Sequence, residues 1–250
     1  MTDPLPRTPR TRRPAIARLA GARVITVEQA VEAGCRYFLR HGTLDMEAVA
    51  LHLAVSRATL YRVVSSRDAL LGEVLWRLTE RCLDRSRARR TREGIDGTLE
   101  VVRTFARHAL ASRALRGFVA QEPQTATRVL GPDGVVHRRA IEATLALFDE
   151  VGLGKRSPYD LSTPGLVEDP TRVAYLLVQL VESLCFAELA GTRPALDLTE
   201  QTVRGLLVRA CTPRQSKATR LMNAAMCLVW TSVPDVLLRD GGVTLAAAGI

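Results

Sequence analysis

The sequence has few aromatic residues, almost no lysine and only five cysteines among its 250 residues. Aromatic residues make up 4% of the chain, and no run of Val, Ile, Thr and Tyr alternates cleanly with polar residues, which argues against an all-β fold. The five cysteines are odd in number and far apart, so they indicate neither a disulfide framework nor a metal site. We expect each of them to be a small buried apolar group.

Motifs of catalysis and of membrane insertion are also missing. The sequence contains no Gly-rich phosphate loop, no G-x-S-x-G elbow and no H-E-x-x-H, and its four histidines lack the paired spacing of a metal site. Its most apolar late segment, residues 221–238, is interrupted by Asn223, Pro234 and Asp235. No apolar signal core follows Arg12 and Arg13. We therefore expect a cytoplasmic protein without a catalytic, metal, cofactor or membrane-spanning site.

Positive charge is present in excess, and it is unevenly distributed. The net charge is +9, but residues 1–92 hold 18 basic and 9 acidic residues, whereas residues 93–250 hold 17 of each. Residues 1–23 are rich in arginine and proline, which predicts a flexible basic arm. Such a distribution is typical of a nucleic-acid-binding head on a neutral body, although basic stretches also suit membranes and acidic proteins.

The basic third of the chain contains four predicted helices. Thr26 and Gln29 form a capping box for the first helix, and Gly42 provides its left-handed stop. A short helix over residues 45–53 and another from Ser56 to about residue 63 follow, and a longer one runs from residue 65 or 66 to about residue 90. Three short helices with tight turns predict a helix-turn-helix, which inserts its second helix into the major groove of DNA.

The stretch from Val49 to Arg62, VALHLAVSRATLYR, followed by SRDALL at residues 66–71, resembles the signature of TetR-family transcriptional regulators. The resemblance covers residues 24–72. Within the family, the sequence is similar to the QsdR group, whose members are associated with lactone or quorum-signal degradation. Ala54 replaces the usual turn glycine, valines at 63 and 64 replace an aromatic pair, and Arg67 replaces a lysine. The resemblance implies an all-α protein with an N-terminal helix-turn-helix domain and a C-terminal helical domain for ligand binding and dimerisation.

The candidate DNA-binding residues lie on and beside the second helix of this motif. Ser56 can cap the helix and leave amide donors for a phosphate, and Thr59 offers a hydroxyl and a methyl group. Arginine side chains can read guanine or clamp a phosphate. Tyr61 suits a phosphate oxygen, with a packing role as the alternative. The resemblance places Arg67 at a phosphate-binding lysine. The full set is Ser56, Arg57, Thr59, Tyr61, Arg62 and Arg67, with Arg12 and Arg13 in the arm.

The remainder of the chain also has helical periodicity, with helices expected over residues 95–120, 123–129, 134–151, 169–190 and 197–210. The last two carry strong starts, because Asp169 precedes Pro170 and Asp197 forms a capping box with Glu200. The resemblance implies that these two helices, near residues 169–190 and 197–210, pair with their mates in a homodimer. A twofold dimer matches a palindromic DNA operator.

The resemblance also implies a pocket for a small-molecule effector in the helical body. Aromatic residues with a few polar tips are candidates to line it, although ordinary core packing is the alternative for each of them. These candidates are Trp76, Phe105, His108, Phe118, Phe148, Tyr175 and Gln179. An apolar pocket with few polar groups would suit a small amphipathic molecule such as a lactone.

The sequence therefore predicts four segments: a basic arm (1–23), a helix-turn-helix domain (24–72), a ligand-binding and dimerisation domain (73–210) and a C-terminal extension without an assigned role (211–250). We expect a ligand-responsive repressor of a catabolic or efflux operon. Two alternatives stay open, a helical dimer that coats DNA without sequence preference and a helical enzyme, for which His108 is the only candidate group.

Overall fold

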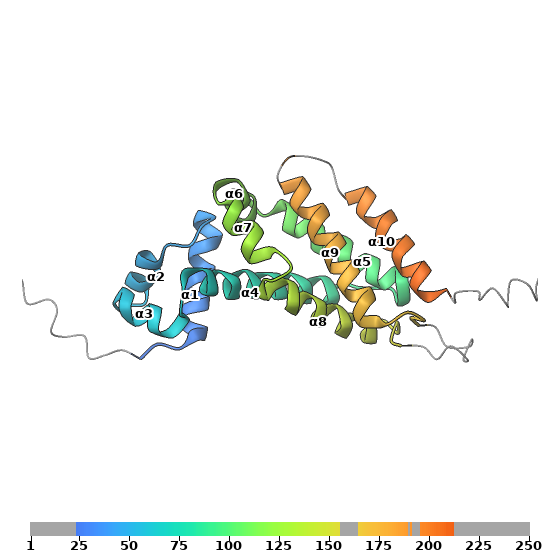
Figure 1. Ribbon diagram of the computed structural model, residues 1–250, viewed down its shortest axis with the longest axis horizontal. Coiled ribbons are helices and arrows are strands. Elements are labelled where there is room, and N and C mark those ends of the chain that lie inside the picture. The colour runs from blue at the N-terminus through green and yellow to red at the C-terminus, as the bar shows by residue number, and fades with distance from the viewer. Residues whose placement is uncertain (1–23, 156–164, 190, 192–195, 213–250) are drawn as a thin grey trace, which may run out of the picture. The chain divides into compact units, whose positions relative to one another are not determined.

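The computed structural model describes residues 24–155, 165–189, 191 and 196–212, and its regular elements are helices (Figure 1). Within these residues there are ten: α1 (Val27–His41), α2 (Met46–His52), α3 (Arg57–Val64), α4 (Arg67–Ala88), α5 (Gly94–Ala111), α6 (Arg113–Gln121), α7 (Pro123–Leu130), α8 (Val135–Glu150), α9 (Pro170–Leu189) and α10 (Leu196–Cys211). The all-α prediction is confirmed. No helix of this described part is both long and apolar enough to cross a membrane.

The ends of the first four helices are set by local side chains. The Thr26 hydroxyl accepts a hydrogen bond from the Gln29 amide at 3.2 Å, and the Gln29 side chain accepts one from the Thr26 amide at 3.1 Å. Gly42 ends α1 with φ at +65°, a conformation that favours glycine, and its N–H bonds to the Phe38 carbonyl at 2.8 Å. Asp45, Ser56 and Ser66 cap α2, α3 and α4. The predicted capping box and stop are confirmed.

One predicted helix is wrong, because residues 95–120 do not form a single helix. The chain breaks at Ser112, whose backbone is extended, with φ at −71° and ψ at 111°. Its hydroxyl accepts a hydrogen bond from the Leu115 amide at 3.3 Å and so begins α6 as a new helix. The apolar periodicity on either side concealed a serine that caps a helix.

The later helices match the predicted ranges to within one or two residues. α10 begins at Leu196, and the side chain of Asp197, on which the last capping box depends, lies outside the described residues. The arm with Arg12 and Arg13 also lies outside them, as does the extension beyond residue 212.

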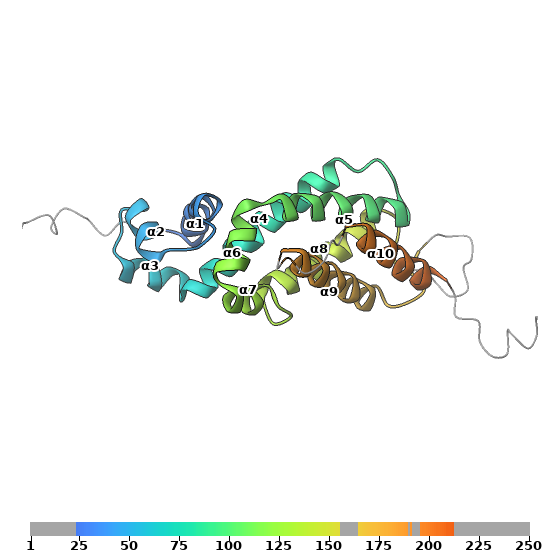
Figure 2. The same cartoon turned by 90° about the horizontal axis from the view of Figure 1, so that it is seen from above.

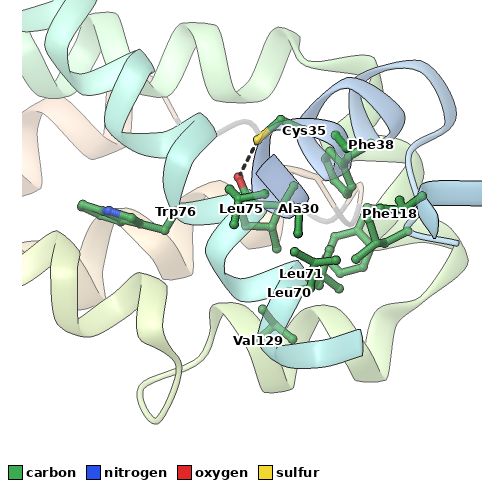
Figure 3. Close-up of a cluster of buried hydrophobic side chains, with 14 of the residues drawn as sticks. Ala30, Cys35, Phe38, Leu70, Leu71, Leu75, Trp76, Phe118 and Val129 are labelled. Atoms are coloured by element: carbon green, nitrogen blue, oxygen red, sulfur yellow. Dashed lines mark hydrogen bonds between the residues drawn. The ribbon is translucent and has the colours of Figure 1, made fainter. Parts of the chain in front are cut away.

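A first apolar cluster joins the helix-turn-helix to α4, α6 and α7 (Figure 3). Phe38 of α1 and Phe118 of α6 are both buried and meet edge to face, with ring centroids 5.6 Å apart. Leu70 and Leu71 of α4 lie beside them in Figure 3, and Val129 contributes from α7. Burial of these side chains fixes the helix-turn-helix against the first turns of α4.

A second cluster holds the body together and is formed by α5, α8, α9 and α10, with Phe148 and Leu207 among its fully buried members. α4 contributes to both parts of the chain. It packs against α1 in the helix-turn-helix and against α5 and α8 in the body, as Figures 1 and 2 show. The helix is therefore continuous across residue 72, where we placed the domain boundary.

Candidate functional site

Helix α3 is anchored by its apolar residues and presents its charged residues to solvent. Leu60 and Val64 are buried, whereas the side chains of Arg57 and Arg62 are exposed. The Ser56 hydroxyl accepts a hydrogen bond from the Thr59 amide at 3.1 Å, so the capping role predicted for Ser56 is confirmed. A short helix anchored by its buried apolar residues thus carries two solvent-exposed guanidinium groups.

The exposed arginines have weak contacts within the chain. Arg57 lies 4.0 Å from the Glu47 carboxylate, and its side chain is 59% exposed. Arg62 donates to the Thr59 hydroxyl at 3.3 Å. Tyr61 is half-buried against the first cluster, so its packing role is present, and its phosphate contact stays a prediction. Neither arginine must break a strong ion pair to reach another anion.

The turn between α2 and α3 contains a residue in an unusual conformation. Ala54 has φ at +55°, in the left-handed region that glycine adopts without strain. Its amide donates to the Leu51 carbonyl at 3.0 Å, which closes the turn. The alanine found by sequence at the usual glycine position therefore keeps the geometry of the turn, at a cost of about 1 kcal/mol.

Arg67, predicted to bind a phosphate, forms strong contacts within the protein. Its Nε donates to the Leu44 carbonyl at 2.8 Å, and its Nη2 lies 2.6 Å from the Glu122 carboxylate. Thr43 donates to the same Glu122 oxygen at 2.6 Å. Arg67 thus joins the turn before α2 to the junction of α6 and α7. A phosphate contact would have to compete with this arrangement.

A second ion pair lies beside the first. Arg128 of α7 donates from Nε and Nη2 to one oxygen of Asp68, at 2.9 and 2.6 Å. The two pairs, Arg67 with Glu122 and Asp68 with Arg128, both connect the start of α4 with α7 or its N-terminal boundary. We call them the α4–α7 link. Sequence reasoning missed Glu122 and Arg128 because they lie 55 and 60 residues from their partners, and no local pattern marks such contacts.

Glu122 is held in its ionised form by this link. Burial, the largest single influence, would raise the pKa of its carboxyl group, but the hydrogen bonds from Arg67 and Thr43, together with the Arg67 charge, lower that pKa overall. The ion pair is therefore intact at neutral pH and weakens only when Glu122 is protonated in acid.

The body contains a largely apolar cavity of about 770 Å³, a volume suited to a small molecule. Three of the seven predicted pocket residues line it: Phe105, His108 and Gln179. His108 Nδ1 lies 2.7 Å from the Thr104 carbonyl of its own helix. Ala126, Thr127 and Leu130 of α7 also form part of the wall. α7 therefore faces the cavity with some residues and takes part in the α4–α7 link with Arg128.

The other four pocket candidates lie elsewhere, because packing uses them in different ways. Phe118 is buried against Phe38, and Phe148 is buried in the second cluster. Trp76 is buried near the Arg139 guanidinium, which lies 5.9 Å from its ring centroid. Tyr175 is 44% exposed on α9. For Trp76, Phe118 and Phe148 the alternative of core packing describes the structure, whereas Tyr175 is neither a wall residue nor a core residue.

The arrangement of a helix-turn-helix, a shared α4 and a helical body that contains a cavity defines an all-α protein of the helix-turn-helix class. Residues 93–208 match the family model described as the Tetracyclin repressor-like, C-terminal domain. No protein of curated function matches the sequence.

Two solved structures illustrate the similarity. The transcriptional repressor QsdR of R. erythropolis, from the TetR family, is 26% identical, with a TM-score of 0.63 over 72% of this chain and 93% of that chain. The TetR family repressor AlkX of Dietzia sp. strain DQ12-45-1b, implicated in biodegradation of n-alkanes, is 17% identical, with a TM-score of 0.54 over 77% of this chain and 100% of that chain. The chain has the all-α fold seen in these TetR-family regulators, and its residues 93–208 are similar to their C-terminal domain.

Proposed function

We propose that the protein is a homodimeric transcriptional repressor that binds a palindromic operator with α3 and releases it when a small molecule fills the cavity. The observation that carries the proposal is the exposure of Arg57 and Arg62 on a helix whose Leu60 and Val64 are buried. A capped helix with solvent-exposed guanidinium groups suits the major groove. The similarity to the transcriptional repressor QsdR of R. erythropolis, at 26% identity, supports a repressor.

The route of the ligand response follows from the position of α7. Ala126, Thr127 and Leu130 contact the cavity, and Arg128 of the same helix pairs with Asp68 at the start of α4. A ligand that displaces α7 therefore acts on α4 and on the helix-turn-helix packed against it. Repression is relieved when the ligand favours the conformation that does not fit the operator.

The α4–α7 link makes a measurable prediction. In a double-mutant cycle with Arg67→Ala and Glu122→Ala, we expect a coupling of about 1 kcal/mol in the free energy of unfolding, because both side chains are only partly exposed. The coupling should be present at neutral pH and should disappear as the pH falls through the lowered pKa of Glu122, since protonation removes the ion pair. Urea denaturation of the four proteins between neutral and acidic pH measures it.

A matched control for this cycle is the pair Arg77 and Glu80, which lie 3.5 Å apart on the more exposed side of α4. We expect its coupling to be below about 0.5 kcal/mol. Equal coupling energies for the two pairs would contradict the idea that the α4–α7 link connects the helix-turn-helix to the body.

The proposed dimer uses α9 and α10, which carry exposed apolar residues. Tyr175 and Leu176 of α9 are 44% and 42% exposed, and Val208 of α10 is 47% exposed. Exposed apolar side chains on neighbouring helices suit a self-complementary interface. We expect the double variant Leu176→Arg, Val208→Arg to be a folded monomer, because two charges would be buried without partners. Light scattering after size-exclusion chromatography gives the mass.

The matched control replaces Leu51 of α2, an exposed leucine far from these two helices in sequence, by arginine. Leu51→Arg should leave the mass of the wild-type oligomer unchanged. A dimer that persists in the double variant would place the interface on another surface.

The central experiment selects genomic fragments with the purified full-length protein and then screens compounds for release of those fragments. Recovery of a common palindrome supports the proposal. A helical dimer that coats DNA without sequence preference would be displaced from a selected fragment by random competitor DNA as well as by the fragment itself. Its affinities for the two DNAs would also have the same salt dependence. The family and the fold point to a transcription factor rather than to an enzyme.

A further inference from the structure

The cavity wall is mostly apolar and contains one acidic group. Apolar side chains dominate the wall, including Leu78, Phe105, Leu130, Leu147 and Phe186. Among the described residues that line the cavity, Glu182 of α9 is the single carboxylate. A polar group in such a wall determines which end of a ligand can lie beside it. A buried polar atom that is left without a hydrogen-bond partner weakens binding.

A histidine holds the Glu182 side chain in place through a short hydrogen bond. His137 of α8 is almost completely buried, and its Nδ1 lies 2.6 Å from Oε2 of Glu182. The His137 ring is fixed in turn by an edge-to-face contact with Tyr175, with centroids 5.5 Å apart. Glu182 therefore has a rigid support, and the side chain itself stays 27% exposed.

The second oxygen of the Glu182 carboxyl group, Oε1, receives no hydrogen bond from any described residue. A single proton shared in the short contact between His137 and Oε2 leaves Oε1 as an acceptor, whichever of the two residues carries that proton. Burial raises the pKa of Glu182, and the hydrogen bond and charge of His137 oppose this rise. The wall thus offers an acceptor in either protonation state.

The arginines of the wall are less available than this carboxyl group. Arg81 pairs with Glu32 at 2.7 Å, and Arg87 pairs with Glu150 at 3.0 Å. Arg85 is exposed to solvent, where its charge is screened. An anionic ligand would therefore need either to break an existing ion pair or to bind at the outside of the cavity.

We infer that the cavity binds an amphipathic molecule with an apolar body and a hydrogen-bond-donating head, a hydroxyl or an ammonium group, directed at Oε1 of Glu182. This inference rests on the proposed ligand response and names the chemical class of the effector. A plain lactone ring offers only acceptors and leaves Oε1 unsatisfied. A carboxylate head brings a second acceptor, and in the ionised state a like charge, against Glu182.

Three molecules with the same ten-carbon alkyl chain test the inference on the full-length protein. They are decylamine, decanol and decanoate, each used below the concentration at which it aggregates. We expect calorimetric titration to show decylamine and decanol binding at least about tenfold more tightly than decanoate, the difference of roughly one hydrogen bond. Decanoate binding as tightly as the other two overturns the inference without the need for any variant.

The variant Glu182→Gln makes the test sharper. When the amide oxygen accepts the hydrogen bond from His137, the amide NH₂ group faces the cavity, so the wall changes from acceptor to donor. The preference for decylamine over decanoate should then fall by about tenfold or reverse. The control Glu142→Gln, at an exposed position of α8, should keep the wild-type preference. An unchanged preference in folded Glu182→Gln overturns the inference.

Release of DNA is measured separately with the same three molecules. If the donor-headed molecules bind as expected but DNA stays bound, the proposed ligand response fails and the assignment of the cavity stands. If another compound releases DNA while the three molecules bind without preference for their heads, the repressor proposal stands and the assignment fails.

Discussion

Replacing Phe118 by alanine should lower the free energy of unfolding by about 3–5 kcal/mol, among the largest losses available in this chain. Phe118 is 0% exposed and meets Phe38 edge to face in the first cluster, which connects α1 with α6. Removing the ring leaves a void between the helix-turn-helix and the body that neighbouring side chains fill only in part. Urea denaturation followed by circular dichroism measures the loss.

Phe105→Ala provides the comparison for this result. Phe105 is half-buried and lines a cavity that already exists, so its removal forfeits fewer contacts. We expect a loss smaller by at least about 1 kcal/mol. Similar losses at both positions would mean that the contact between α1 and α6 adds little to stability. Phe118→Leu, which keeps much of the volume, should fall between wild type and Phe118→Ala.

Replacing Arg57 by alanine should weaken operator binding by about 1–3 kcal/mol, which is roughly 5-fold to 150-fold, and leave the fold intact. The arginine is 59% exposed and has only a 4.0 Å contact with Glu47, so its loss changes little within the protein. Arg62→Ala should act in the same direction. Titration of labelled operator DNA, once selected, followed by fluorescence anisotropy, measures both affinities.

The salt dependence of these variants separates two roles. If Arg57 reads a base, Arg57→Ala relaxes specificity at one position of the operator, whereas loss of a phosphate contact lowers the salt slope by about one. Tyr61→Phe should also weaken binding, through loss of a hydroxyl contact with a phosphate. Arg107→Ala, at an exposed arginine of α5, serves as the control. Unchanged sequence-specific binding in the Arg57 and Tyr61 variants would contradict the assignment of these residues.

The helix-turn-helix could be predicted from sequence because its geometry is set locally. The capping box of Thr26, the left-handed Gly42 and the serine caps of α3 and α4 each depend on residues within a few positions along the chain. The break at Ser112 was also encoded locally, but the helical periodicity of its neighbours dominated the interpretation. A serine followed by renewed periodicity is the signal that would have found it.

The candidate site was predictable only where it lies on a single helix. The exposed arginines of α3 lie on one short helix of a recognisable motif, whereas the α4–α7 link and the pair of His137 with Glu182 join residues 45 to 60 positions apart. Aromatic residues gave no guide to the cavity, since a ring such as Phe118 satisfies the same apolar pattern in a solid core. Which buried residues line empty space depends on how whole helices pack, and one sequence does not contain that information locally.

The continuity of α4 limits how the helix-turn-helix of this protein can be fused to the ligand-binding body of another protein. The helix packs on α1 at its start and on α5 and α8 further along, so no flexible linker separates the part that carries α3 from the part that holds the cavity. A chimera that joins this head to another body must be fused within the helix and in rotational phase. Each residue inserted or deleted there turns one half relative to the other by about 100° and shifts it by about 1.5 Å. Fusions whose junctions differ in length by one residue should therefore differ in whether DNA binding responds to the ligand. The response should return when the length changes by about seven residues, which is two full turns of the helix.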